Sequence, residues 1–210
     1  MASHSIRTEA IVAAALEIAE ERGVAGITTG ALARRFNFTE AALYRYFPGK
    51  AAIVASALQH LGERVFATML IELMPDAAGH GQTIEAQLEG HIRRFASRQG
   101  LLLELLVAAA AGRDREVQEA GDAFLREYAT RMDGYFSQVQ KRTLIAATPS
   151  GVELERLWIC QLLGGFVRCR LTREPWDPTT QSGFEAFLGQ LRSHSRSAER
   201  QEAKLEPTGP

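Results

Sequence analysis

Side chains suited to contact with nucleic acid are concentrated between residues 40 and 50. The segment reads EAALYRYFPGK, and a helix over it buries Leu43 and Phe47, which lie four residues apart, on one face. The outer face then combines phenols, a guanidinium and a carboxylate, carried by Glu40, Ala41, Tyr44, Arg45 and Tyr46. Such groups bind base edges and phosphates. The pattern indicates a surface that contacts duplex DNA.

The preceding residues predict how this segment is held in place. Thr28 or Thr29 caps a first short helix, since a threonine oxygen accepts a hydrogen bond from an amide one turn on. Asn37 follows where the chain turns, and asparagine tolerates left-handed backbone better than most residues. Phe38 fills the gap between the helices, and Thr39 caps the second one. Two helices joined by a tight turn form a helix-turn-helix.

This stretch resembles the DNA-binding domain of the TetR family of bacterial regulators. The shared features are a threonine cap, a three-residue turn, an L-Y-x-x-F core and a proline followed by a lysine. They stand here as Thr28, Asn37-Phe38-Thr39, Leu43-Tyr44-Arg45-Tyr46-Phe47, Pro48 and Lys50. A narrower similarity to nucleoid-occlusion members of that family rests on Ile27-Thr28-Thr29 and residues 40–45. The resemblance implies an all-α fold, with an N-terminal three-helix helix-turn-helix DNA-binding domain and a C-terminal helical domain for dimerisation and ligand binding.

The resemblance and the side-chain chemistry together assign roles on DNA. Tyr44 and Tyr46 are expected to reach phosphate, sugar or a thymine methyl group. Arg45 is expected to bind guanine and Lys50 to pair with phosphate, while the capping threonines offer a hydroxyl at a positive helix end. The plainer alternative is a solvated helix face with one packed tyrosine. The predicted DNA-binding residues are Thr28, Thr29, Thr39, Glu40, Ala41, Tyr44, Arg45, Tyr46 and Lys50.

Glu40 departs from common family usage, as do Gly30 and Ala31. A glutamate repels phosphate, but its carboxylate accepts a hydrogen bond from the amino group of cytosine. It also stabilises the first turn of a helix through the helix dipole. Base reading and helix stabilisation are therefore both open for Glu40.

The rest of the chain shows helical periodicity and no strand-pairing signal. Helices are predicted at about residues 7–22, capped by Gly23, and at 50–74, 83–98, 101–111, 113–144, 151–173 and 184–191. The predicted domains are a DNA-binding domain over 1–50 and a helical ligand-binding and dimerisation domain over 51–193. Residues 194–210 are polar and form a tail that is expected to be disordered.

A homodimer is expected, because one helix-turn-helix makes few base contacts and two of them match a palindrome. The helix over 151–173 and the last helix are the candidate surface, where they form a four-helix bundle across a twofold axis. Gly164 and Gly165 permit close approach of a second backbone there, or else they pack against the chain's own core. The predicted interface residues are Leu157, Gln161, Gly164, Gly165, Arg168, Phe187 and Leu191.

The second domain carries large apolar residues at helical spacing. The resemblance implies that such a domain encloses a pocket whose ligand moves the two DNA-binding domains apart, and the alternative is ordinary core. Few charges interrupt these helices, which favours an apolar or amphipathic ligand. The predicted pocket residues are Phe95, Leu102, Leu105, Phe124, Tyr128, Met132, Trp158 and Leu162.

Nothing in the sequence is typical of an enzyme. The five histidines are scattered, and no H-E-x-x-H, G-x-S-x-G or Walker sequence occurs. We expect no catalysis, no cofactor and no metal. A cytoplasmic location is expected, because the N-terminus lacks a signal-peptide core and no long stretch stays apolar and uncharged. Cys160 and Cys169 lie nine residues apart on one predicted helix, hence on opposite faces, and are expected to be reduced and buried.

The sequence therefore predicts a homodimeric repressor that binds a palindromic operator and is released by a small apolar or amphipathic ligand. A DNA-bound adaptor of the nucleoid-occlusion type, which captures a cell-division protein, is the alternative. The net charge of -1 does not exclude DNA binding, because charge acts locally. Between residues 28 and 50 the cations Arg34, Arg35, Arg45 and Lys50 face Glu40 alone, a local net charge of +3.

Overall fold

The computed structural model describes residues 2–73, 84–95, 97–141 and 149–177, together with Phe187 and Gly189. For residues 2, 3, 70–72, 94, 95 and 97–99 it describes the backbone only. Every regular element in these ranges is a helix, so the predicted all-α fold is confirmed. Within the same ranges, no helix combines the length and the apolar character needed to cross a bilayer.

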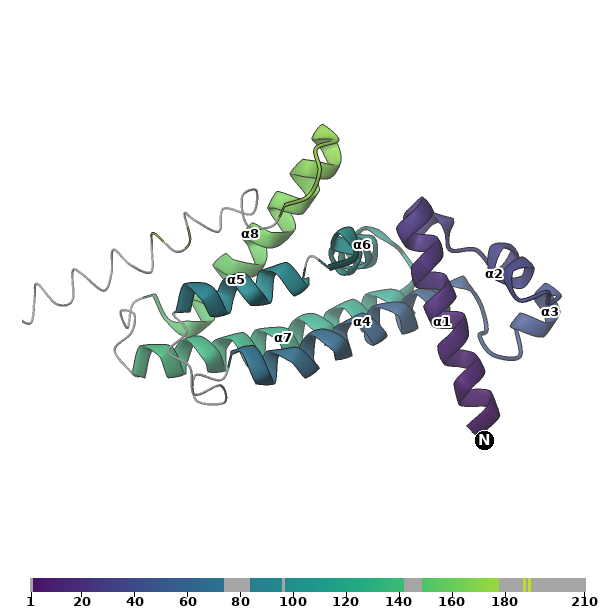
Figure 1. Cartoon of the computed structure of the whole chain (residues 1–210), viewed down its shortest axis with the longest axis horizontal. Helices are drawn as coiled ribbons and strands as arrows, with labels where there is room; N and C mark the ends of the chain where they lie inside the picture. Colours follow the sequence, from purple (N-terminus) through teal and green to yellow (C-terminus); the bar gives the residue numbers. More distant parts are fainter. Residues whose placement is uncertain are drawn as a thin grey trace, which may run out of the picture. The chain divides into compact units, whose positions relative to one another are not determined.

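The order of the elements matches the predicted succession of helices (Figure 1). They are α1 (Ala2–Arg22), the short 3-10 helix η1 (Val24–Gly26), α2 (Thr29–Arg35), α3 (Glu40–Leu43), α4 (Lys50–Glu72), α5 (Ile84–Phe95), α6 (Ser97–Ala111), α7 (Arg115–Lys141) and α8 (Gly151–Thr172).

Several boundaries differ from the predicted ones; α5, for example, ends at Phe95 and not near residue 98. Helix α1 begins at Ala2 and not near Arg7, and its first turns are supported by local bonds such as that from Thr8 Oγ1 to the carbonyl of His4 at 2.9 Å. Helix α3 ends at Leu43, because the amides of Tyr46 and Phe47 then share the Leu43 carbonyl in a turn. Helix α6 is assigned from Ser97 and not from Leu101, although Gly100 inside it has φ 78°.

Two compact units make up the chain, and the first contains residues 1–71 and 94–126. Its α1 ends as predicted at Gly23, which has φ 73°. The next amide, that of Val24, donates to Glu104 Oε1 of α6 at 2.8 Å. Helix α4 runs beside the first part of α7 (Figure 1), where Phe66 stacks on Phe124 with ring centroids 5.2 Å apart. The first unit thus holds the predicted DNA-binding segment, while the predicted domain boundary after residue 50 stays a prediction.

The second unit contains residues 72–93 and 127–210. Its described core is aromatic: Trp158 of α8 and Phe136 of α7 both contact Phe187, with centroids 5.3 and 5.9 Å apart. Helix α8 begins with a capping box, in which the Ser150 amide donates to Glu153 Oε2 at 2.8 Å and the Ser150 hydroxyl accepts from the Glu153 amide. The predicted connection before the last helix and the predicted tail lie outside the described residues.

The cysteine prediction is half wrong. Cys169 is buried, as expected, but Cys160 is exposed. The two residues lie nine positions apart on α8, hence on opposite faces, and Cys169 lies on the buried face.

Candidate nucleic-acid interface

Two threonine caps fix the starts of α2 and α3. Thr28 has extended backbone and its hydroxyl accepts from the Ala31 amide at 3.1 Å, so the capping residue is Thr28 and not Thr29. Thr39 does the same for α3, accepting from the Ala42 amide at 3.1 Å. Each bond satisfies an amide that a helix start leaves without an intrahelical partner. The predicted cap at Thr39 is thereby confirmed.

The turn between the two helices is built on Asn37. Its φ of 52° lies in the left-handed region, as predicted. The Phe38 amide donates to the Ala33 carbonyl at 2.8 Å, and the Asn37 amide to the Arg34 carbonyl at 3.3 Å. This pair of bonds is the Schellman pattern that closes a helix C-terminus. It reverses the chain within three residues and sets the direction of α3.

A side-chain bridge also joins α2 to α3. The Thr29 hydroxyl donates to Glu40 Oε2 at 2.7 Å. The other carboxylate oxygen lies 3.2 Å from where a Cβ at Gly30 would stand, so glycine there leaves room for the carboxylate. This contact is a role for Glu40 that neither predicted alternative contained. It also gives a physical reason for Gly30, which the sequence showed only as unusual.

A row of aromatic rings connects the turn with α1. Phe38 stacks between Phe36 and Tyr46, at centroid distances of 5.7 and 6.3 Å, and Tyr46 contacts the His4 ring at 5.0 Å. Tyr46 is therefore half-buried, and the expectation that it points outward like Tyr44 is wrong. Tyr46 lies in the turn formed by residues 44–46 after the end of α3, so the outer face of that helix does not extend to it. Whether Tyr46 contacts DNA stays a prediction.

The remaining predicted contact residues are exposed, except Thr29, which is half-buried. Leu43 and Phe47 are buried, as predicted. Tyr44 is 52% exposed, and Ala41, Arg45 and Lys50 are exposed as well. Lys50, the first residue of α4, reaches the Ala25 carbonyl with its Nζ at 3.4 Å. An aromatic and cationic surface thus spans the residues that directly follow α3 and the start of α4.

One cation of this region is paired with a carboxylate from another helix. Arg35 forms an ion pair with Glu17 of α1, which lies outside residues 28–50. The net charge of +3 over residues 28–50 therefore includes one cation whose charge is offset by Glu17. The pair ties α2 to α1, so its arginine serves the packing of the three helices.

The predicted dimer residues divide into an exposed set and a buried one. Leu157 is 41% exposed on α8, Gly164 and Arg168 are exposed, and Gln161 and Gly165 are half-buried. A Cβ at Gly164 would meet no atom of the described residues within 4 Å, which counts against the alternative of packing on the chain's own core. Phe187 is fully buried by its own chain, so including it among interface residues was wrong. Leu191 lies outside the described residues.

The predicted pocket residues fall into both units. Leu102, Leu105 and Phe124 are buried in the first unit. The second unit buries Tyr128, Met132, Trp158 and Leu162. The side chain of Phe95 is not described. Burial of this kind is what both a pocket lining and an ordinary core require, so the pocket stays a prediction.

A buried polar cluster in the second unit was missed by sequence reasoning. Trp158 Nε1 donates to the Tyr128 hydroxyl at 2.7 Å, and His91 Nε2 lies 3.0 Å from the same oxygen. Burial lowers the pKa of His91 to about 4 and raises that of Tyr128. His91 is therefore neutral at pH 7. Helix α5 carries His91 seven residues after Ile84, at helical spacing with the buried Leu88 and Ile92, so the local periodicity places it on the apolar face.

The sequence of this chain is similar to those of known bacterial regulatory proteins. Residues 11–57, which include the whole helix-turn-helix, match the family described as "Bacterial regulatory proteins, tetR family". The nucleoid occlusion factor SlmA of Aliivibrio fischeri strain ES114 is 38% identical over 187 residues, 88% of this chain and 93% of the relative. That of Marinobacter nauticus is 28% identical over 177 residues, 80% of this chain and 88% of the relative.

Solved structures show the same fold at lower identity. The reduced form of Escherichia coli NemR has a TM-score of 0.68 at 13% identity, over 89% of this chain and 96% of that one. A transcriptional regulator from Rhodococcus sp. Rha1 has a TM-score of 0.67 at 18% identity, over 89% of this chain and 96% of that chain. At such identities the likeness concerns the fold alone.

Proposed function

This chain belongs to the tetR family of bacterial regulatory proteins, and from that premise we propose that it is a homodimeric repressor bound to a palindromic operator. Regulators of this family bind DNA and dimerise, and the family is generally not one of enzymes. We infer no catalytic activity for this chain.

The observation that carries the proposal is the construction of the helix-turn-helix. Two threonine caps and a left-handed Asn37 hold α3 so that Tyr44 and Arg45 face solvent while Leu43 is buried. A phenol and a guanidinium directly after a short, capped helix are suited to phosphate and guanine in the major groove. We assign direct contact to Tyr44, Arg45 and Lys50.

Dimerisation is supported by the exposed stripe of α8. Leu157, Gln161, Gly164, Arg168 and Leu171 follow each other at alternating intervals of four and three residues, the spacing of a helix–helix seam. Leu171 is 79% exposed at one end of the stripe, far more than a leucine with a covering neighbour. A second copy of α8 would cover it. A twofold dimer then presents two copies of α3, which suits half-sites about one helical turn of DNA apart.

The effector is proposed to be apolar or amphipathic. In support, the described core of the second unit is dominated by aromatic and aliphatic side chains, with the His91–Tyr128–Trp158 cluster as a polar element among them. A ligand that fits only one arrangement of the helices shifts the protein toward that arrangement. DNA release follows when the favoured arrangement no longer matches both half-sites.

A second candidate is a DNA-bound adaptor of the nucleoid-occlusion type. It is favoured by the two relatives named above, which are called nucleoid occlusion factors and align with 80 and 88% of this chain. An adaptor keeps its DNA while it captures a cell-division protein. A repressor of the ligand-released type loses its DNA when the ligand is added.

Genome-wide mapping of bound DNA in the source organism tests both candidates. Sites beside a few promoters, each with an inverted repeat and increased transcription after deletion of the gene, are expected for the repressor. Sites spread over the chromosome without transcriptional effect would favour the adaptor. A purified protein that binds none of the recovered fragments would contradict both.

A further inference from the structure

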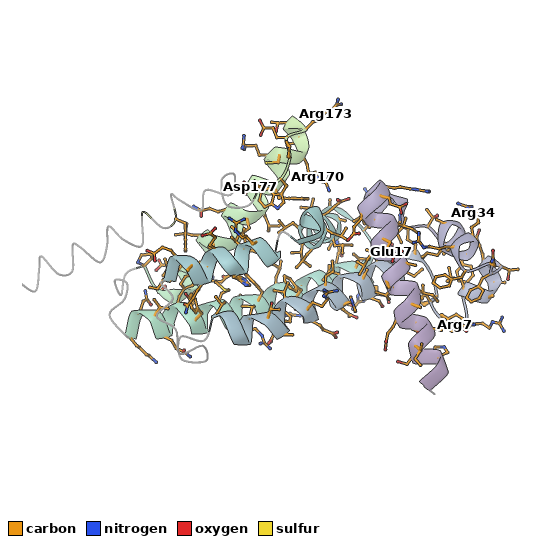
Figure 2. The ribbon with its side chains drawn as sticks, in the orientation of Figure 1. Arg7, Glu17, Arg34, Arg170, Arg173 and Asp177 are labelled. Atoms are coloured by element: carbon orange, nitrogen blue, oxygen red, sulfur yellow. The ribbon has the colours of Figure 1, made fainter. Side chains whose placement is uncertain are left out.

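The first turns of α1 carry a cation outside the reading surface, by which we mean the DNA-contacting surface formed by Tyr44, Arg45 and Lys50. Arg7 is exposed, and its guanidinium carbon lies 5.5 Å from the centroid of the Phe38 ring. Phe38 directly follows Asn37 in the turn that seats α3. Arg7 therefore lies on the side of α1 that faces the turn (Figure 2). A residue at the beginning of the chain is thus placed against the helix-turn-helix.

The row of rings explains why Arg7 is held in this position. Phe38 stacks on Tyr46 at an interplanar angle of 11°, and His4, one turn before Arg7, contacts Tyr46 at 5.0 Å. The two α1 residues thus pack on two neighbouring rings, Phe38 before α3 and Tyr46 after it. A cation over an aromatic face is attracted by the ring quadrupole, which orders an otherwise flexible arginine. The in-plane N–H groups of a stacked guanidinium remain able to donate.

The surroundings leave Arg7 suited to an anion. The nearest acid along α1 is Glu9, whose carboxylate accepts from the Ser5 hydroxyl at 3.2 Å, and that of Glu40 accepts from Thr29; among the described residues neither forms an ion pair with Arg7. Tyr46 belongs to the same turn as Tyr44 and Arg45, so Arg7 adjoins the surface already assigned to DNA. The oxygens that lie beside a base-reading surface on duplex DNA are phosphates.

We propose that Arg7 binds a backbone phosphate of duplex DNA and that α1, through Arg7 on Phe38, is part of the DNA interface. This inference rests on the proposed function, since it extends the surface that reads DNA. It adds a contact that carries charge but no sequence information. The contact should raise the affinity for duplex DNA of any sequence and make that affinity more dependent on salt concentration.

A salt titration with a short fluorescent duplex of arbitrary sequence tests the contact, because phosphate binding does not require the operator. Each phosphate contact contributes about 0.9 to the slope of log K against log salt concentration. Arg7→Gln should reduce the magnitude of this slope by about 0.9. Its affinity for the duplex at 0.1 M salt should be about eightfold lower, because a slope difference of about 0.9 over a tenfold range of salt concentration changes the affinity by that factor. Arg7→Lys keeps the charge and should retain the slope.

Arg126→Ala provides the matched control. Arg126 is an exposed arginine of the same unit, pairs with Asp122 on α7 at 2.9 Å, and lies outside the reading surface. Its replacement should leave the slope unchanged. A folded Arg7→Gln protein with the wild-type slope would overturn the inference while leaving the proposed function intact.

The remaining outcomes separate the two claims. Absence of duplex binding by the folded wild-type protein at low salt would refute the proposed function and the inference with it. Loss of binding to an acidic peptide in Arg7→Gln, with duplex binding unchanged, would show that Arg7 serves a protein partner and would overturn the inference alone.

Discussion

The hydroxyl of Thr29 donates a 2.7 Å hydrogen bond to Oε2 of Glu40 and so joins the first residue of α2 to the first residue of α3. Thr28, its neighbour, caps α2 instead. The two adjacent threonines therefore have different tasks. Glu40 acts on the orientation of α3, and this role competes with reading a base.

Removing either side chain of the Thr29–Glu40 hydrogen bond should have the same effect on DNA binding. If Glu40 positions α3 through Thr29, Thr29→Val and Glu40→Ala should each weaken binding, and the double variant should be no weaker than either single one. The expected coupling is about 0.5–1 kcal/mol, as for an exposed charged hydrogen bond. A double-mutant cycle on operator affinity measures it. Additive effects, with the preference changed at one base pair for Glu40→Ala alone, would instead identify Glu40 as a base reader.

The effect of Gly30→Ala on stability should depend on which residue occupies position 40. Alanine is favoured over glycine within a helix by up to about 1 kcal/mol. With Glu40 present, the added Cβ would lie 3.2 Å from its Oε1, so Gly30→Ala should bring little or no gain in stability. In the Glu40→Ala background the same change should stabilise the protein. Urea unfolding of the four combinations checks this, and equal effects in both backgrounds would contradict the contact.

The turn should tolerate glycine better than alanine at position 37. Asn37 has φ 52°, where a residue with a Cβ other than asparagine or aspartate is strained by about 1–2 kcal/mol. Asn37→Ala should therefore lower the free energy of unfolding by about 1 kcal/mol, and Asn37→Gly should change it little. Thermal unfolding of both variants measures the difference. An alanine variant as stable as the glycine variant would show that the turn relaxes out of the left-handed region.

The α8 stripe should determine the oligomeric state. Leu157→Glu and Leu171→Glu place a carboxylate on the exposed seam and should shift the protein toward monomer, since burying an unpaired charge is unfavourable. Val152→Glu is the control, because Val152 is 44% exposed on the same helix but lies off the stripe. Sedimentation velocity over a range of concentrations distinguishes the species. Dimers of unchanged affinity in both leucine variants would exclude this face.

The sequence predicted the local parts of the reading surface well. The left-handed backbone of Asn37 and the helix cap at Thr39 are predictable because each depends on amides within a few residues. Even so, Thr28 and Thr29 could not be told apart from their order alone. The capping box of Ser150 and Glu153 likewise follows a local pattern, S-x-x-E.

Contacts between distant residues were beyond such reasoning. Arg7 and Phe38 are 31 positions apart, and nothing in either local pattern indicates that one lies on the other. The half-burial of Tyr46 has the same origin, because it depends on His4 and on the early end of α3. Helical periodicity assigns a face to a side chain only while the helix continues.

Buried His91 should make the protein lose stability in mild acid. Its pKa is lowered from about 6.5 in the unfolded chain to about 4 by burial, so the folded state binds fewer protons between these values. Unfolding then takes up a proton, and the free energy of unfolding falls as the pH drops from about 6.5, by about 3 kcal/mol at pH 4, below which this loss levels off. Glu155 acts oppositely, because burial raises its pKa. The difference between wild type and His91→Gln in urea midpoints across this range isolates the histidine, and parallel pH profiles would disprove its role.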